Sequence, residues 1–245
     1  MKCCLLIPHY NHIQALGQLL LQLEPLAYYC IIVDDGSNME TKKKLYTISK
    51  QYPWLDILNL FPNTGKGAAI HYGLSHALRL GYSHALQIDA DGQHCVQDIP
   101  KLVAAAKQYP QHLICANPIF DEHIPKNRLY GRKITNFWVA IETWSTAIAD
   151  AMCGFRVYPL QSTLKIMNST KVGRRMDFDI DILVRHYWAK TPLQFIPSAV
   201  AYPTDGVSHF KMLKDNVLIS KLHCRLFFSM LARIPQLLSR TLSHE

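Results

Sequence analysis

The chain has 245 residues, of which 49% are hydrophobic and 18% charged, enough to form a folded α/β domain without disulfide staples and too apolar for a disordered chain. Its 26 Lys and Arg residues outnumber 18 Asp and Glu residues, and the formal net charge of +8 favours anionic partners such as nucleotide phosphates or acidic lipid headgroups. We do not expect nucleic acid as a partner, because the sequence has neither a basic face interleaved with aromatic residues nor a recognisable nucleic-acid-binding module.

Seven cysteines, none of them in a CxxC pair, predict buried thiols in a reducing compartment. The first apolar run stops at Pro8 after about five residues, which is too short for a signal peptide. The sequence has no uninterrupted stretch of about 18 apolar residues, so that no membrane-spanning helix is predicted. We therefore expect a cytoplasmic protein which, if it meets a membrane, lies peripherally on the cytoplasmic face.

Short apolar runs alternate with helical patterns over the first half of the chain, and each run ends in a turn rich in Pro, Asn, Asp or Gly. This alternation predicts an α/β fold with a mostly parallel, Rossmann-like sheet flanked by helices. Strands are expected at residues 3–8, 29–34, 56–60, 84–89, 112–116 and 194–201. Helices are expected at residues 13–24, 40–52, 67–80, 96–109, 128–149 and 177–189.

Other parts of the second half are less regular. Residues 117–127 are expected to form a loop, and residues 153–158 a short segment between helices. Residues 212–242 mix apolar residues with Lys and Arg and are expected to be helical, with a break or kink at Pro235. The pattern divides the chain into a catalytic domain, residues 1–210, and a basic amphipathic helical tail, residues 211–245.

Two acidic clusters directly follow predicted strands: Asp34-Asp35-Gly36-Ser37 and Asp89-Ala90-Asp91. Because the carboxyl ends of parallel strands meet at one edge of a sheet, both clusters should face the same crevice. Carboxylates gathered there require a counter-charge, and hard oxygen ligands suit Mg²⁺ or Mn²⁺ with substrate phosphates completing the coordination. Either motif alone would indicate only a strand-to-helix turn, but the two together favour a metal-assisted site.

Four motifs in order resemble those of the family 2 glycosyltransferases with the GT-A fold. They are IPHYN at residues 7–11, VDDGS at 33–37, NTGKG at 63–67 and DADGQH at 89–94. Within that family the dolichyl- or polyprenyl-phosphate sugar synthases are most similar, over roughly residues 3–205. The resemblance implies inverting, metal-dependent transfer of a hexosyl or N-acetylhexosaminyl group from a UDP- or GDP-sugar to a lipid-linked acceptor, such as polyprenyl phosphate or another membrane glycolipid precursor.

The resemblance also implies roles for individual residues. The donor nucleotide would be bound by Pro8, Tyr10, Asn11, Asp34, Asp35, Lys66 and Asp89. The metal ion would be held by Asp89, Asp91 and Gln93. The catalytic group would comprise Asp91, Arg156 and Asp179.

Several of these residues could have an ordinary structural role instead of the functional role that the resemblance implies. The segment at residues 8–11 could instead be a strand-ending turn with Asn11 as a helix cap, and a lone lysine such as Lys66 is usually solvated. Arg156 could pair with Asp150 or touch a phosphate. Asp179 belongs to a group of acids that would stabilise the start of a helix, and a general base is required only if the acceptor is a hydroxyl rather than an ionised phosphate.

Two segments on the acceptor side depart from the synthase pattern. Residues 115–118 read Cys-Ala-Asn-Pro where the synthases commonly have Gly-Ser-Arg, so that Arg128 and Arg132 become candidates for binding the acceptor phosphate. His209 stands where the synthases often have a lysine, in a Gly-x-Ser-Lys loop. The donor side, in contrast, retains the family's motifs.

The basic tail predicts a helix that lies on an anionic membrane surface, with packing against the catalytic domain or a dimer partner as the alternative. Two other functions remain open. A nucleotidyltransferase would also use an α/β sheet and Mg²⁺, but it would usually have a glycine-rich loop where this chain has residues 9–12. A non-catalytic sugar-nucleotide-binding domain would not need Asp91.

Overall fold

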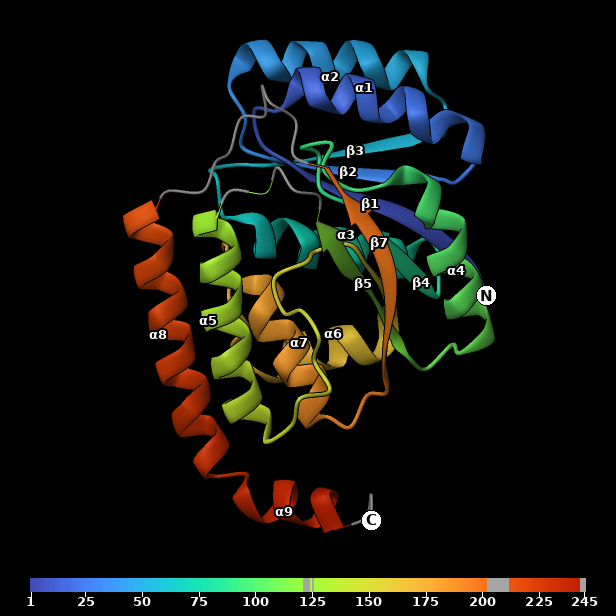
Figure 1. The fold of residues 1–245 in the computed structure, drawn as a ribbon. Helices are drawn as coiled ribbons and strands as arrows, with labels where there is room; N and C mark the ends of the chain where they lie inside the picture. Colours follow the sequence, from blue (N-terminus) through green and yellow to red (C-terminus); the bar gives the residue numbers. More distant parts are fainter. Residues whose placement is uncertain (121–123, 125, 202–211, 243–245) are drawn as a thin grey trace.

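In the computed structural model, which describes residues 1–120, 124, 126–201 and 212–242, seven strands form one sheet with helices on both faces (Figure 1). The strands are β1 (Cys3–His9), β2 (Cys30–Asp35), β3 (Leu55–Leu60), β4 (His84–Gln87), β5 (Leu113–Phe120), β6 (Arg156–Pro159) and β7 (Leu193–Val200). Their order is β3-β2-β1-β4-β6-β5-β7. Only β6, among these strands, runs antiparallel to its neighbours, and the predicted mostly parallel sheet is confirmed.

The helices of the described residues alternate with the strands in the first half of the chain and gather in the second. They are α1 (Ile13–Leu23), α2 (Met39–Gln51), α3 (Lys66–Arg79), α4 (Ile99–Gln108), α5 (Lys126–Thr143), α6 (Leu160–Ser169), α7 (Phe178–Trp188), α8 (Met212–Leu231) and α9 (Ile234–Leu242). Two 3₁₀ turns, Glu24–Leu26 and Val96–Asp98, precede β2 and α4.

Alternation of side chains along the central strands produces two separate cores. In β1, Leu5 and Ile7 join the cluster that contains the buried face of α1, whereas Cys4 and Leu6 join the cluster that contains α3, α6 and α7. Successive strand residues point to opposite faces of a sheet, and the central strands carry apolar residues toward both faces because helices cover both. The sheet is thereby held rigidly between two layers of helices.

Most predicted elements agree with the structure to within two residues, but residues 117–120 were wrongly assigned to a loop. They extend β5 to Phe120 by pairing in register with β7, from Asn117 opposite Pro197 to Phe120 opposite Val200. Beyond Cys115, β5 is paired with β7 alone, so that Pro118 can be accommodated in the strand. Residues 121–123 and 125 of the predicted loop lie outside the described residues.

The helix predicted over residues 128–149 also differs, because α5 spans Lys126–Thr143. Trp144 adopts a left-handed conformation with φ of 50°, and the Ser145 amide donates to the Ala140 carbonyl at 3.2 Å; a left-handed residue at this position ends a helix. Residues 145–155 then form an irregular segment that leads into β6. Helix α6, which follows, was not predicted.

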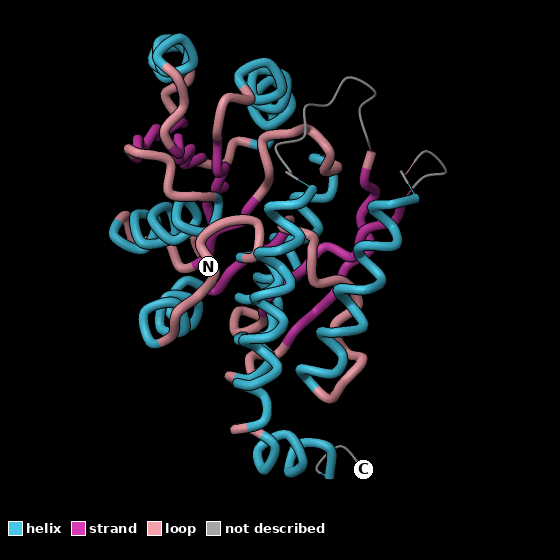
Figure 2. Tube along the Cα trace, turned by 90° about the vertical axis from the view of Figure 1, so that its left-hand side faces the viewer, coloured by secondary structure: helices cyan, strands magenta, loops and turns pink. Residues whose placement is uncertain are grey.

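The tail forms α8 and α9, and the break predicted at Pro235 is confirmed, with the proline in the first turn of α9, where its missing N–H is harmless. In two views α5 and α8 lie side by side (Figures 1 and 2). Their buried faces belong to one hydrophobic cluster with α7. The predicted domain boundary at residues 210 and 211 lies outside the described residues and stays a prediction. No helix in the described ranges is both long and apolar enough to cross a membrane.

Candidate functional site

A cavity of about 380 Å³ lies at the carboxyl ends of β1, β2 and β4, where α3 begins and α5 and α8 approach the sheet. Open α/β sheets bind ligands at this edge. Of the residues predicted to bind nucleotide or metal or to act in catalysis, those lining the cavity are Pro8, Tyr10, Asp35, Lys66, Asp89, Asp91 and Gln93. Those outside its lining are Asn11, Asp34, Arg156 and Asp179.

Asp35 fixes the loop between β3 and α3 at one wall of the cavity. Its carboxylate accepts hydrogen bonds from the Thr64 amide at 2.7 Å, the Thr64 hydroxyl at 2.9 Å and the Gly65 amide at 2.7 Å. Gly65 has φ of 103°, and a Cβ there would lie 2.4 Å from the Arg174 carbonyl oxygen, so that only glycine fits. Asp35 therefore positions the loop that carries Lys66.

Asp34 is fully buried on the other side of β2, where it connects the ends of β1 and β2. It accepts from His9 Nδ1 at 3.0 Å and from the Ser37 amide and hydroxyl. His9 Nε2 accepts from a backbone amide, which fixes the tautomer with the proton on Nδ1. Burial alone would raise the pKa of Asp34, but the hydrogen bonds from His9 and Ser37 lower it below its ordinary value.

Asn11 completes this junction between the β1 and β2 turns. It has φ of 53°, its amide donates to the Ser37 hydroxyl at 2.9 Å, and its side-chain oxygen accepts from the Asn38 amide at 3.0 Å. Asn11 and Asp34 were predicted as nucleotide-binding residues, but the described contacts of both lie within the protein. Neither side chain borders the cavity.

Lys66, the first residue of α3, forms the centre of the charged group in the cavity. Its Nζ lies 2.7 Å from Asp89 Oδ2 and 2.7 Å from Asp179 Oδ2. Gln87 lies beneath, with its amide nitrogen 3.4 Å from Asp89 Oδ1 and 3.3 Å from Asp179 Oδ1, and it accepts from the Tyr158 hydroxyl at 3.1 Å. The structure thus brings together two acids that are 90 residues apart in the sequence.

These contacts shift the pKa values of the group. Burial disfavours the charged form of Lys66, but the carboxylates of Asp179 and Asp89 outweigh it and raise the lysine pKa above its ordinary value. Burial likewise opposes ionisation of Asp89, whereas Lys66 and His94 lower its pKa strongly. The pair is therefore an ammonium and a carboxylate at neutral pH.

Asp91 differs from Asp89 in having no ion pair among the residues that the structure describes. Its carboxylate accepts from the Gln93 amide at 3.1 Å. Burial, and next the negative charge of Asp89, raise the pKa of Asp91. A cation placed between Asp89 and Asp91 would offset both causes of this shift by favouring the charged carboxylate.

The donor set of the cavity fits the Mg²⁺ or Mn²⁺ ion expected from the sequence. Asp89 and Asp91 supply hard carboxylate oxygens at its floor, and no group of three or more His, Cys, Asp or Glu side chains that could hold a metal occurs within the described ranges. Such ions commonly take one or two carboxylates and complete their shell with water and substrate phosphates. Gln93 also lines the cavity.

The segment before β6 packs beneath Lys66, outside the lining of the cavity. Asp150 is held by Arg132 at 2.6 Å and accepts from the amides of Met152 at 3.0 Å and Cys153 at 2.7 Å. Gly154 follows, and a Cβ there would lie 2.5 Å from Gln87 Nε2 and 2.9 Å from Lys66 Nζ. Glycine is thus required for the backbone to approach the charged group.

Arg156 is fully buried and stabilises the segment before β6 from the side away from the cavity. It donates to the backbone carbonyls of Asp179 at 2.6 Å and Ala151 at 2.9 Å, so that it joins the start of α7 to this segment. Pairing of Arg156 with Asp150, one of the two alternatives weighed from the sequence, is not seen in the described contacts. Asp150 is bound by Arg132 instead.

The three acids near the start of α7 have three different environments. Asp179 reaches Lys66, whereas Asp181 is buried with Arg185 and Arg225, each at 2.6 Å. Asp177 accepts from the Arg175 amide at 3.0 Å. Only Asp179 of these acids therefore belongs to the charged group of the cavity.

Several residues of the cavity were not predicted from the sequence. The cations Arg175 and Lys214 line it together with Arg128, which was one of two candidates for the acceptor side; the other, Arg132, is engaged with Asp150. Arg175 precedes α7 and Lys214 is in the first turn of α8. No local motif marks them, because they join the cavity only through the packing of α7 and α8.

His94, the last residue of the DADGQH motif, also lies in the group. Its Nε2 is 3.9 Å from Asp89 Oδ2, and its ring stacks on Phe155 with 4.9 Å between centroids. His209, the other histidine weighed from the sequence, lies outside the described residues.

Comparison with known proteins identifies related chains. The family model described as glycosyl transferase family 2 matches residues 4–167. This match supports the glycosyltransferase prediction over the nucleotidyltransferase alternative.

Two curated relatives are named as lipid-phosphate sugar transferases. A UDP-N-acetylglucosamine–dolichyl-phosphate N-acetylglucosaminyltransferase of Methanococcus voltae is 25% identical, over 74% of this chain and 78% of its own. The human dolichyl-phosphate beta-glucosyltransferase is 25% identical over 68% of this chain, and the match spans only 53% of the human protein.

A solved structure shares the fold. Glucosyl-3-phosphoglycerate synthase from Mycobacterium tuberculosis, in complex with Mn²⁺, UDP-glucose and phosphoglyceric acid, superposes with a TM-score of 0.69 at 12% identity and covers 94% of this chain and 79% of its own. The GT-A fold predicted from the motifs is confirmed.

Proposed function

Because the chain belongs to glycosyl transferase family 2, we propose that it transfers a sugar from a nucleoside diphosphate donor to a lipid phosphate, with inversion at the anomeric carbon. The observation that carries this proposal is the charge arrangement of the cavity. Asp89 and Asp91 lie at its floor, while Arg128, Arg175 and Lys214 line it from other elements. Carboxylates suit a cation bound to the donor, and the three cations suit a second, phosphate-bearing substrate.

On the donor side, Pro8, Tyr10 and Asp35 form the nucleoside wall of the cavity in our proposal, and Asp89 and Asp91 hold Mg²⁺ or Mn²⁺. When bound, such an ion neutralises charge on the leaving diphosphate. Gln93 is a possible additional ligand by its position in the lining. Asn11 and Asp34 act indirectly, because they hold the two turns that border the wall.

On the acceptor side, an ionised lipid phosphate can attack the anomeric carbon without a general base. The names of the two curated relatives, which both act on dolichyl phosphate, support this class of acceptor. We assign Asp179 to positioning, since its carboxylate already binds Lys66 at 2.7 Å. Arg156 likewise positions Asp179 through its backbone, and Arg128, Arg175 and Lys214 bind the acceptor phosphate.

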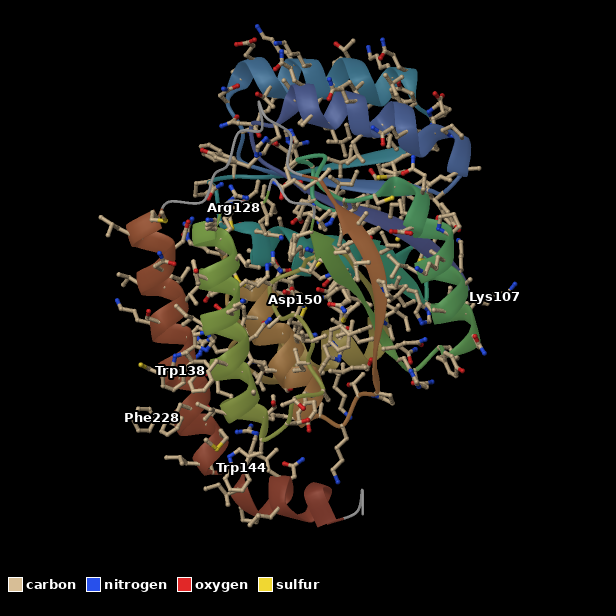
Figure 3. All side chains as sticks on the ribbon, viewed as in Figure 1. Lys107, Arg128, Trp138, Trp144, Asp150 and Phe228 are labelled. Carbon is tan, nitrogen blue, oxygen red and sulfur yellow. The ribbon has the colours of Figure 1, made fainter. Side chains whose placement is uncertain are left out.

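The outer faces of α5 and α8 support peripheral membrane contact. Apolar side chains are exposed on both: Tyr130, Ile134, Phe137, Trp138, Leu213, Val217 and Phe228. Lysines are exposed on the same helices: Lys126, Lys133, Lys214 and Lys221. Figure 3 shows Trp138 and Phe228 along the outer side of this helix pair, with Arg128 at the end of α5 nearest the sheet. Apolar residues mixed with cations suit an anionic membrane surface.

This assignment revises the tail hypothesis. One face of α8 packs on the domain through Ile219, Leu222, Leu226 and Met230, as the alternative held, and the opposite face joins α5 to form the membrane surface that we propose. The lipid phosphate would then enter the cavity past Arg128 and Lys214, at the amino-terminal ends of the two helices. We place this surface on the cytoplasmic face, where the seven free thiols would remain reduced.

Sugar transfer can be measured with radiolabelled UDP- and GDP-sugars, polyprenyl phosphate in detergent, and Mn²⁺ or Mg²⁺. We expect lipid-linked product that is abolished by a chelator and reduced at least about hundredfold by Asp91→Asn. Glu40→Gln is the control, because it removes an exposed carboxylate on α2 whose partner is Lys44. Full lipid labelling by the Asp91→Asn protein would disprove the assigned role of Asp91, and labelling of no lipid acceptor would disprove the proposed function.

Membrane contact can be measured separately, by co-flotation with vesicles containing anionic lipid. We expect the double variant Phe137→Ser and Phe228→Ser to lose most vesicle binding. Tyr46→Ser is the matched control, because Tyr46 is an exposed aromatic residue on α2, away from this surface. Equal flotation of the double variant and the control would contradict the assignment.

A further inference from the structure

We propose that Lys66 is a built-in counter-ion that neutralises Asp89 while the donor is absent, so that the chain binds its divalent cation tightly only together with the nucleotide. The proposal rests on the function proposed above and adds an order of binding to it. Lys66 is a positioning residue in this scheme, exchanging one anionic partner for another.

The first support is the geometry of the ammonium group. Lys66 Nζ lies 2.7 Å from one oxygen each of Asp89 and Asp179, distances typical of charge-assisted hydrogen bonds. Asp89 has its second oxygen 3.4 Å from the Gln87 amide nitrogen. Both carboxylate oxygens of Asp89 therefore already have partners inside the protein.

The second support is the charge of the group. Asp89 and Asp179 share Lys66, whereas Asp91 beside them has no ion pair in the described part of the chain. A divalent cation that approaches the Asp89 carboxylate comes close to the Lys66 ammonium group, which is bound to the same carboxylate. The two positive charges repel each other strongly in a partly buried site. The carboxylate pair is thus weakened as a metal site while Lys66 remains in place.

The third support is the position of the lysine relative to the cavity. Lys66 lines the cavity and its side chain is 16% exposed, so that its ammonium can reach a ligand placed there. Lys66 is also the first residue of α3, and the positive end of the helix dipole favours an anion there. A diphosphate in the cavity offers Lys66 new anionic partners and releases Asp89 to the cation that arrives with it.

The packing around Lys66 keeps the resting contact in place. Gly154 leaves room for the ammonium group, since a Cβ there would lie 2.9 Å from Lys66 Nζ, and the Gln87 amide donates to both Asp89 and Asp179. A lysine that only filled space would not need a glycine at residue 154 or the two carboxylates of Asp89 and Asp179 beside its ammonium group. The arrangement is instead that of a cation site already occupied by a side chain.

The test is a titration of the full chain with Mn²⁺, followed by the electron paramagnetic resonance signal of free Mn²⁺, without nucleotide and with saturating UDP or GDP. We expect wild-type protein to bind Mn²⁺ at least tenfold more tightly with nucleotide than without. Lys66→Met should bind Mn²⁺ at least tenfold more tightly than wild type in the nucleotide-free titration. Lys66→Arg, which keeps the charge, should behave as wild type.

A gain of metal affinity is a result that loss of a purely structural lysine would not produce. If Lys66→Met does not fold, as judged by its circular dichroism, Lys66→Gln replaces it with the same expected gain. Unchanged or weaker nucleotide-free Mn²⁺ binding by the charge-removing variant overturns the proposal, as does wild-type Mn²⁺ affinity that is independent of nucleotide.

These outcomes are distinguishable from failure of the proposed function. If neither UDP nor GDP binds, with or without Mn²⁺, the proposed sugar-nucleotide function is wrong. The nucleotide-free comparison of Lys66→Met with wild type still decides whether Lys66 excludes the cation from Asp89.

Discussion

Gly154→Ala should damage the cavity more than it damages the fold. A Cβ at this position would lie 2.5 Å from Gln87 Nε2, 2.9 Å from Lys66 Nζ and 3.2 Å from Asp89 Oδ2. To restore ordinary contact, at about 3.4 Å, the Gln87 amide must move by about 0.9 Å and the Lys66 ammonium by about 0.5 Å. The backbone of Gly154 does not itself require glycine, since its φ is outside the left-handed region.

The expected magnitudes follow from these displacements. Overpacking of this kind lowers the free energy of unfolding by about 1–3 kcal/mol. A shift of about 1 Å in groups that position a substrate lowers the rate by about a hundredfold, equivalent to about 2.7 kcal/mol of transition-state stabilisation. We therefore expect kcat/KM for sugar transfer to fall by about two orders of magnitude in a protein that still folds.

The assay combines sugar-transfer rates with urea unfolding, and Gly17→Ala is its matched control. Gly17 lies within α1, and a Cβ there would meet nothing within 4 Å; Ala in place of Gly in a helix should stabilise the protein by up to about 1 kcal/mol and leave transfer unchanged. A Gly154→Ala protein that retains transfer within threefold of wild type would refute the reasoning, because the charged group would then tolerate the displacement.

Two further predictions concern stability. Asp35→Asn should lower the free energy of unfolding by about 2–4 kcal/mol and raise the donor KM, because an amide cannot accept all three hydrogen bonds from Thr64 and Gly65; urea unfolding checks this, and a loss no greater than that of Thr64→Val, which removes only the hydroxyl bond, would contradict it. His186 is buried between two threonines, and burial, followed by the charge of Arg156, lowers its pKa to about 3. Since the unfolded chain then binds a proton that the folded chain excludes, stability should fall on acidification from about pH 6.5 towards 3, by about 1.4 kcal/mol per pH unit from this residue. Urea unfolding of His186→Gln at several pH values should show a smaller slope, and an identical slope would contradict the prediction.

The cavity residues from the first half of the chain were largely predictable because they follow buried strands. The apolar runs before Asp35 and Asp89 identify strands, and the ends of parallel strands meet at one edge, so that local sequence already implied their proximity. The same reasoning failed for Asp34, since neighbouring residues at a strand end point to opposite sides. The motif could not show which of the two acids would face the cavity.

Residues brought in from the second half of the chain were not predictable in this way. Arg128 was weighed equally with Arg132 until packing placed Arg132 on Asp150, and Arg175 and Lys214 carry no local signal. Likewise β5 continues through Pro118 only because β7 pairs with it. These outcomes depend on contacts between segments that are distant in the sequence.

By itself, then, the sequence determined the α/β fold, the family and the two acidic strand ends, because hydrophobic periodicity and turn residues act over a few positions. Tertiary structure alone decided that Lys66 lies between Asp89 and Asp179, that Arg156 supports the site from behind, and that α5 and α8 share one exposed apolar surface. The reason is physical: ion pairs, burial and the direction of a side chain are set by which elements pack together, and that packing is a property of the whole chain.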